Sequence, residues 1–345
     1  MDVEKLRAAL KERKQPAYRF EQVLKAVYEE GVSSYDEITT LPAVLRETLS
    51  VKAPILSVSE DNLVVSRDGL AHKALLSLKD GLVIETVLLK PKPGRTWSVC
   101  VSSQVGCAMG CTFCATGLMG FRRDLSAEEI ADQVLYWRQY AAANKIGGRI
   151  TNVVYMGMGE PMLALDSVEE SLRILMDPKR FALSARHISV STVGIILGME
   201  RFIKRFPQVN LALSLHSADD TLRTKLVPVN KKYPLKALTV FLRKALESSR
   251  RKIFIEYVLL EGENDSRRYA NALAQFVHKV GRPDLLHVNL IVWNPTETQH
   301  QKPSVGTARL FREWLQDRGV RVTIRKNLGA DIQGACGQLF AGKNR

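Results

Sequence analysis

Three cysteines, Cys107, Cys111 and Cys114, lie within eight residues in the stretch CAMGCTFCATG. Closely spaced thiolates are typical of a metal centre, and zinc and an iron–sulfur cluster are the two candidates. A structural zinc ion takes four ligands, commonly in two pairs, and the chain has no second Cys-x-x-Cys pair. Cys336 or a histidine could still complete a zinc site. A four-iron cluster would use one thiolate per iron, so three cysteines would leave one iron open to a small molecule.

Composition limits the class of protein. At 345 residues, with 46% hydrophobic and 25% charged residues, the chain predicts a globular protein of one large domain or two ordinary ones. No apolar run reaches the length of a membrane span, and the charged start MDVEKLRAALKERK does not resemble a signal peptide. We expect a cytoplasmic protein with reduced thiols, so its five cysteines indicate metal binding or chemistry more than structural disulfides.

The chain is strongly basic, with 50 Lys and Arg against 36 Asp and Glu and a net charge of +14. Such a balance favours a polyanionic partner, most often nucleic acid, although surplus lysine also aids solubility. Candidate phosphate contacts are Arg122, Arg123, Arg250, Arg251, Lys252, Arg325 and Lys326. Each of them, taken singly, is better explained as an ordinary solvated charge.

An α/β framework is predicted to position the cysteines. Residues 3–50 predict short helices, and residues 54–90 predict strands of a small antiparallel sheet, with a turn or linker at 90–95. From residue 97, short apolar strands alternate with helical segments in six or seven units. That rhythm predicts parallel strands with crossover helices, hence a full or partial barrel or a doubly wound sheet. The predicted parts are a helical domain (1–50), a β-rich connection (51–95) and a catalytic domain (96–345).

Polar residues follow several of the predicted strands. In parallel α/β folds, ligands bind at the carboxyl ends of the strands. The residues at these ends include Gly159, Glu160, Ser191, Ser214, Leu215, His216 and Asn294. Each polar residue has an ordinary explanation as a turn or cap residue, but together they fit a ligand pocket. The cysteine triplet follows the first strand of this series and belongs to the same edge.

The spacing Cys-x-x-x-Cys-x-x-Cys, with the aromatic Phe113 before the last cysteine, resembles the motif of the radical S-adenosylmethionine (SAM) superfamily. The resemblance implies a partial barrel, a 4Fe-4S cluster on Cys107, Cys111 and Cys114, and SAM on the open iron. In that superfamily, reduction of the cluster cleaves SAM to a 5′-deoxyadenosyl radical. MGMGEP resembles the superfamily's glycine-rich SAM contact, in which Glu160 would accept a hydrogen bond from the SAM ammonium.

Six motifs in order make the resemblance more specific. CVSSQVGCAMGCTFCATG, VYMGMGEP, VSTVG, LSLHS, VNLIVWNPT and DIQGACGQL are together similar to the RlmN/Cfr family of radical SAM RNA adenosine methyltransferases. The N-terminal residues resemble that family's helical accessory domain less specifically. The implied fold is α/β, a partial (β/α)6 radical SAM barrel with a small N-terminal helical domain and a short β extension. The implied cofactors are a 4Fe-4S cluster and two molecules of SAM per turnover.

The resemblance also assigns the two remaining cysteines and one carboxylate. Cys336, in a glycine-rich loop, would be methylated by a first SAM, and its S-methyl group would lose hydrogen to the radical and add to an adenine carbon. Cys100 would be the resolving thiol that forms a transient disulfide with Cys336 and releases the base. Without the resemblance, each is explained as a small buried hydrophobe. Glu85 would be the proton acceptor, since a carboxylate desolvated on an apolar strand suits proton transfer.

The same resemblance assigns SAM binding to Gly159, Glu160, Ser191, Ser214, Leu215, His216 and Asn294. FALSARHISVSTVGII and SRRKIFIEY resemble the carbon-8 branch of the family, whereas the GEP form of the glycine motif resembles the carbon-2 branch. We predict methylation of carbon 2 of an adenosine in 23S ribosomal RNA, with transfer RNA as a further candidate substrate.

Three alternatives stay open at this point. They are Cfr-type methylation of carbon 8, a radical SAM enzyme with another substrate, and a zinc-stabilised RNA-binding protein without catalysis. The expected partners are RNA and an electron donor such as flavodoxin or ferredoxin. The expected state is a cytoplasmic monomer without membrane association.

Overall fold

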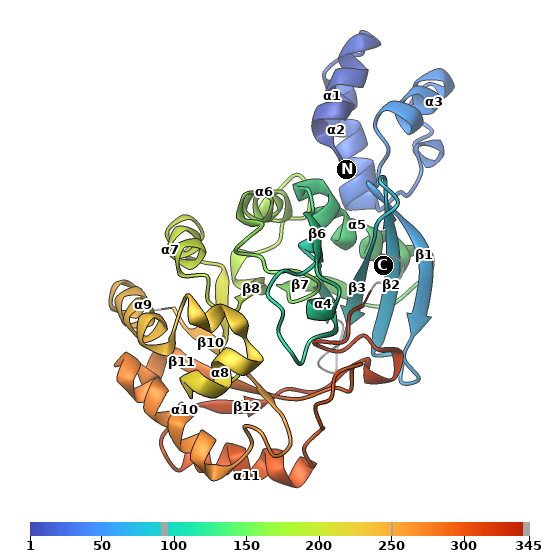
Figure 1. The fold of residues 1–345 in the computed structure, drawn as a ribbon. Helices are drawn as coiled ribbons and strands as arrows, with labels where there is room; N and C mark the ends of the chain where they lie inside the picture. The colour runs from blue at the N-terminus through green and yellow to red at the C-terminus, as the bar shows by residue number, and fades with distance from the viewer. Residues whose placement is uncertain (91–95, 250, 341–345) are drawn as a thin grey trace.

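The computed structural model describes residues 1–90, 96–249 and 251–340, and it begins with a group of short helices. They are α1 (Val3–Glu12), α2 (Tyr18–Lys25), a π-helical turn (Ala26–Glu30), a 3-10 turn (Tyr35–Glu37) and α3 (Ala43–Lys52). Asp2 caps α1, because its side chain accepts the Lys5 amide at 3.0 Å. These helices project from one end of the molecule, and their apolar faces join the main hydrophobic core (Figure 1).

A ten-stranded sheet runs through the rest of the described chain, in the order β1-β2-β3-β4-β7-β8-β9-β10-β11-β12. Its parallel part consists of β4 (Thr96–Cys100), β7 (Arg149–Tyr155), β8 (Ile188–Thr192), β9 (Asn210–Ser214), β10 (Ile253–Leu259), β11 (Leu286–Val292) and β12 (Val322–Ile324). Because β4 and β12 are not neighbours in this order, the barrel is partial and not closed. The predicted α/β class and partial radical SAM barrel are confirmed.

Helices connect the parallel strands, and most of them cover the outer side of the curved sheet. They are α5 (Ala127–Ala143), α6 (Leu165–Met176), α7 (Ile196–Arg205), α8 (Asp220–Leu226), α9 (Leu235–Ser248), α10 (Arg267–Val280) and α11 (Val305–Gln316). Figure 1 shows α6, α7, α9, α10 and α11 following one another along that side. In α10, Leu273, Phe276 and Val277 are buried at helical spacing, which is the pattern of a helix with one face on the sheet.

Three antiparallel strands extend the sheet beyond β4. They are β1 (Val58–Val65), β2 (Ala71–Leu78) and β3 (Val83–Leu89), and β3 pairs with β4 so that Val87 lies opposite Cys100. The small antiparallel sheet predicted for residues 54–90 is therefore not separate, because the apolar run of β3 is buried against β4. Residues 91–95 of the predicted linker lie outside the described residues. The boundaries of the three predicted parts stay a prediction.

A short hairpin and one helical turn frame the cysteine loop, and neither was predicted. β5 (Gln104–Gly106) pairs with β6 (Phe121–Asp124), and α4 (Ala115–Leu118) starts directly after Cys114. Elements of three or four residues are too short to show a periodic apolar pattern. In the described part of the chain, no helix is long and apolar enough to cross a membrane.

Candidate active site

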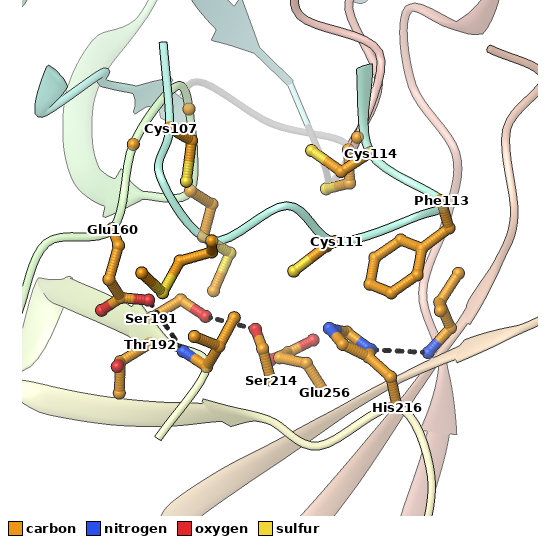
Figure 2. Close-up of a pocket in the computed structure, with 18 of the residues that line it drawn as sticks. Cys107, Cys111, Phe113, Cys114, Glu160, Ser191, Thr192, Ser214, His216 and Glu256 are labelled. Carbon is orange, nitrogen blue, oxygen red and sulfur yellow. Dashed lines mark hydrogen bonds between the residues drawn. The ribbon is translucent and has the colours of Figure 1, made fainter. Parts of the chain in front are cut away.

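The three clustered cysteines lie in the loop between β5 and α4. Their sulfur atoms turn toward a common space, and Glu160, Ser191, Ser214, Glu256 and His216 lie across it (Figure 2). This pocket has an empty volume of about 890 Å³ with its mouth included, and it lies at the carboxyl ends of the parallel strands. It is lined by residues of Cys107–Cys114, the glycine motif, the ends of β8–β11 and Cys336 with Gly337. The predicted location of the site therefore agrees with the observed pocket.

The loop thiols are buried and electrostatically coupled. Burial raises the pKa of Cys107 to about 12 and the pKa of Cys111 well above its usual value, and the charge of Cys114 raises both further. Such thiols ionise only when positive charge is placed beside them. Iron ions of a cluster bound in this pocket would supply that charge, so the donor set fits a thiolate-bound cluster.

Zinc and a 4Fe-4S cluster make different demands on the positions of their ligands. A tetrahedral zinc needs its ligands around one point, whereas a 4Fe-4S cube places each thiolate on a different iron. Within the ranges that the structure describes, no group of three or more His, Cys, Asp or Glu side chains is arranged to hold one metal ion.

The glycine motif after β7 forms one wall of the pocket. Gly159 has φ of +103°, and a Cβ atom there would lie 2.6 Å from the Gln104 Cβ. The resemblance predicted a glycine-rich SAM contact here, and the structure shows that Gly159 also lets this wall pack against β5. Glu160 is buried, and its carboxylate accepts the amides of Met162 at 3.0 Å and Val193 at 2.9 Å. Burial raises the pKa of Glu160, and these amide hydrogen bonds oppose the rise.

Ser191 and Ser214 lie side by side on two neighbouring strands. Ser191 belongs to β8 and Ser214 ends β9, and their hydroxyl oxygens are 3.0 Å apart. Both line the pocket. A hydroxyl pair of this kind can both donate to and accept from the polar groups of a bound ligand.

His216 presents one ring nitrogen to the pocket. Its Nδ1 accepts the Val258 amide at 3.1 Å, and the other ring nitrogen faces the pocket beneath Cys111 (Figure 2). Burial and the nearby Arg223 lower the pKa of His216 to about 3, so the ring is neutral and Nε2 carries the hydrogen. His216 is therefore a fixed hydrogen-bond donor toward the pocket. Its ring packs edge-on against Phe113, with the two ring centroids 4.7 Å apart.

The buried Glu256 forms an ion pair with the partly exposed Arg325 at the pocket, and sequence reasoning did not assign it. Glu256 lines the pocket; its carboxylate accepts Asn289 Nδ2 at 2.8 Å and lies 3.4 Å from Arg325 Nη1. The signal in the sequence was a carboxylate inside the apolar run IFIEYVLL, which is unusual for a buried strand. Arg325, predicted as a phosphate contact, also acts electrostatically on Cys100 and Cys336, the two cysteines outside the triplet.

Those two cysteines lie within electrostatic reach of each other. Cys336 is exposed and lines the pocket, and Asn294 Nδ2 donates to its carbonyl oxygen at 3.3 Å. Cys100 is buried; burial raises its pKa to about 12, a charge on Cys336 raises it further, and Arg325 lowers it. All five cysteines are free thiols, so the predicted Cys100–Cys336 disulfide is not formed in this structure and stays a prediction.

Four predicted site residues do not line the pocket: Cys100, described above, and Glu85, Leu215 and Asn294. Glu85 is buried with its carboxylate 2.8 Å from Lys73 Nζ, and it accepts the Phe340 amide at 2.7 Å. Leu215 is fully buried, and its carbonyl oxygen accepts Arg223 Nε at 3.1 Å. Asn294 is buried behind Cys336, and its Oδ1 has no hydrogen-bond partner in the structure. Their assigned roles stay predictions.

The basic residues are dispersed around the molecule. Arg123 is occupied by Asp80 at 2.6 Å and Glu129 at 2.8 Å. Arg251 donates to Asn210 Oδ1 at 2.7 Å, and with Lys252 it lines a second pocket near the start of β10. Arg250 lies outside the described residues. The structure brings none of these side chains to the cysteine pocket except Arg325, so the phosphate contacts stay predictions.

Two family models match separate parts of this chain. Residues 101–272 match the model of the radical SAM superfamily, and residues 1–55 match that of the ribosomal RNA large subunit methyltransferase N-terminal domain. The chain is 41% identical over 331 residues to the probable dual-specificity RNA methyltransferase RlmN of Chloroflexus aurantiacus, covering 94% of this chain and 87% of that one.

A second relative and a solved structure match over nearly the whole length. The ribosomal RNA large subunit methyltransferase Cfr of Clostridium botulinum strain Okra is 40% identical over 339 residues, covering 97% of this chain and 96% of the relative. The crystal structure of a radical SAM methyltransferase from Sphaerobacter thermophilus has a TM-score of 0.91 and 39% identity, covering 99% of this chain and 98% of that one.

Proposed function

Because this chain belongs to the RlmN/Cfr family of radical SAM methyltransferases, with their 4Fe-4S cluster and SAM, we propose that it methylates carbon 2 of an adenosine in 23S ribosomal RNA. The observation that carries the proposal is that the exposed Cys336 thiol opens into the same pocket as the three cluster cysteines. A methyl carrier must reach both the SAM in this pocket and a base that enters from solvent. The word "dual-specificity" in the name of the Chloroflexus relative supports transfer RNA as a second substrate.

The pocket residues have separate tasks in this proposal. Cys107, Cys111 and Cys114 would hold the cluster, which together with SAM would supply the radical chemistry of the reaction. Glu160, the Ser191–Ser214 pair and the His216 N–H would hold the polar groups of SAM. Cys336 would carry the methyl group, Cys100 would release the product by attacking the Cys336 sulfur, and Glu85 would accept a proton.

An RNA product assay tests the target carbon. The protein is reconstituted with iron and sulfide without oxygen and incubated with SAM, a reductant and unmodified 23S ribosomal RNA or transfer RNA. Nucleoside mass spectrometry is expected to find 2-methyladenosine. A product consisting only of 8-methyladenosine would replace carbon 2 by carbon 8, the alternative favoured by the Cfr relatives. A protein that holds one zinc and no iron would exclude the enzyme.

The remaining partners follow from the same chemistry. Reduction of a low-potential cluster requires a one-electron donor, for which flavodoxin or ferredoxin is proposed. Ribosomal RNA as substrate implies a cytoplasmic enzyme. A monomer is proposed, since one chain supplies every residue of the pocket described above.

A further inference from the structure

A hydrogen-bond chain lies behind the cysteine loop, on the side away from the pocket lining. His300 Nδ1 lies 2.5 Å from Glu263 Oε1, and His300 Nε2 lies 3.0 Å from Thr112 Oγ1. Thr112 stands between Cys111 and Cys114, whereas Glu263 follows β10 and His300 follows β11. None of the three lines the pocket, and the His300 side chain is only 10% exposed.

The direction of the chain follows from donor and acceptor chemistry. A carboxylate only accepts, so Nδ1 of His300 carries the hydrogen that Glu263 binds. In the neutral ring Nε2 is then an acceptor, and the Thr112 hydroxyl donates to it. Glu263 thus fixes the tautomer and the orientation of His300, and His300 fixes the rotamer of Thr112.

Further contacts connect the same loop to the end of α8 and to the residue after β11. The Thr112 amide donates to the Leu226 carbonyl at 3.1 Å, and Trp293 Nε1 donates to the Phe113 carbonyl at 3.1 Å. His300 packs edge-on against Trp293, with ring centroids 6.2 Å apart. The loop is therefore held by Leu226 and the pocket-lining Trp293, in addition to the Glu263–His300 pair.

We propose that Glu263, His300 and Thr112 are positioning residues that order the cysteine loop before the cluster is inserted and slow the loss of the cluster afterwards. Outer hydrogen bonds are a general means of fixing metal ligands, because a loop that is already ordered loses less freedom on binding. The inference rests on the cysteine loop as a cluster site and not on the choice of RNA or target carbon.

Hydrogen exchange on the metal-free protein tests the ordering directly. His300→Phe keeps an aromatic ring but removes both hydrogen bonds, and Thr112→Val removes the hydroxyl alone. Each is expected to accelerate exchange in residues 107–117 about tenfold after correction for intrinsic rates, as the loss of buried hydrogen bonds predicts. Glu263→Gln keeps a neutral acceptor and should show a smaller effect.

His287→Phe is the matched control, because His287 Nε2 lies 2.9 Å from Thr323 Oγ1 between β11 and β12, away from the loop. On reconstituted protein, His300→Phe should release iron to a chelator about tenfold faster than the control. Exchange and iron release equal to those of the control would overturn the proposal, as would acceleration spread evenly over β8 and the rest of the chain. Neither measurement involves RNA, so both remain informative if the proposed methylation fails.

Discussion

Arg325 is the residue that connects the two cysteines of the proposed reaction. Burial raises the pKa of both Cys100 and Cys336, and the Arg325 guanidinium opposes that rise. The ion pair of Arg325 with Glu256 at 3.4 Å holds the guanidinium at the pocket. A positive charge favours the thiolate, which is the form that attacks SAM or a sulfur. Arg325 therefore favours the reactive thiolate form of both cysteines, an effect that a solvated basic residue on the surface would not have.

Replacing Arg325 by Met should slow methyl transfer from SAM to Cys336. Loss of the positive charge raises the pKa of Cys336, so less thiolate is present at a given pH, and the rate should fall about tenfold, with the pH profile moved up by roughly one unit. Intact-protein mass spectrometry measures the methylation. Arg325→Lys keeps the charge and should recover most of the rate. Identical profiles for Arg325→Met and the unmodified protein would contradict this role.

The release of product should depend on pH through Cys100. Because burial places the pKa of Cys100 at about 12, its thiolate fraction rises with pH throughout the neutral range. Release of RNA from the Cys336 adduct is therefore expected to accelerate about tenfold per pH unit. Single-turnover quench experiments measure that release. Cys100→Ala should leave the adduct intact at every pH, and pH-independent release by the unmodified protein would exclude Cys100 as the resolving thiol.

At the scale of elements, Gly159 determines how the glycine motif packs on β5. Gly159→Ala adds a Cβ 2.6 Å from Gln104 at a φ of +103°, whereas Gly81→Ala adds one in open space at a φ of +79°. Both variants carry backbone strain, but only Gly159→Ala adds a clash. We expect it to lose about 1–3 kcal/mol more unfolding free energy than Gly81→Ala in urea. If the two variants lose the same unfolding free energy, Gly159 is not packed tightly against Gln104.

The regular elements were predictable because their patterns are local. The strand–helix alternation after residue 97 and the polar strand ends gave the partial barrel and the edge that carries the site. The hairpin of β5 and β6 was not predicted, because strands of three and four residues are too short to show a repeated apolar–polar alternation. Glu256 and His300 were missed for another reason: their roles come from contacts between segments far apart in the chain.

At the scale of the whole molecule, the antiparallel extension supports the loop that carries Cys336. The Arg67 amide donates to Asp331 at 3.0 Å, and Lys73 Nζ lies 3.4 Å from the Gln333 carbonyl. Glu85, on β3, accepts the amide of Phe340 at 2.7 Å. The resemblance predicted Glu85 as a proton acceptor, and these contacts give it a structural task that a sequence motif could not reveal.

Glu85→Gln distinguishes the structural task from the chemical one. The variant leaves the partly buried Lys73 without its carboxylate, now 2.8 Å away, and weakens the acceptor for Phe340. Hydrogen bonds to charged groups contribute about 1.5–3 kcal/mol, so a structural Glu85 predicts a loss of that order and faster hydrogen exchange over residues 329–340. Glu12→Gln is the matched control, because its pair with Lys52 is exposed and should leave stability unchanged. If Glu85→Gln has the unfolding free energy and the hydrogen-exchange protection of the control but releases no product, proton transfer alone accounts for Glu85. If its unfolding free energy and protection fall together with the methylation of Cys336, the antiparallel extension holds the methyl carrier in place.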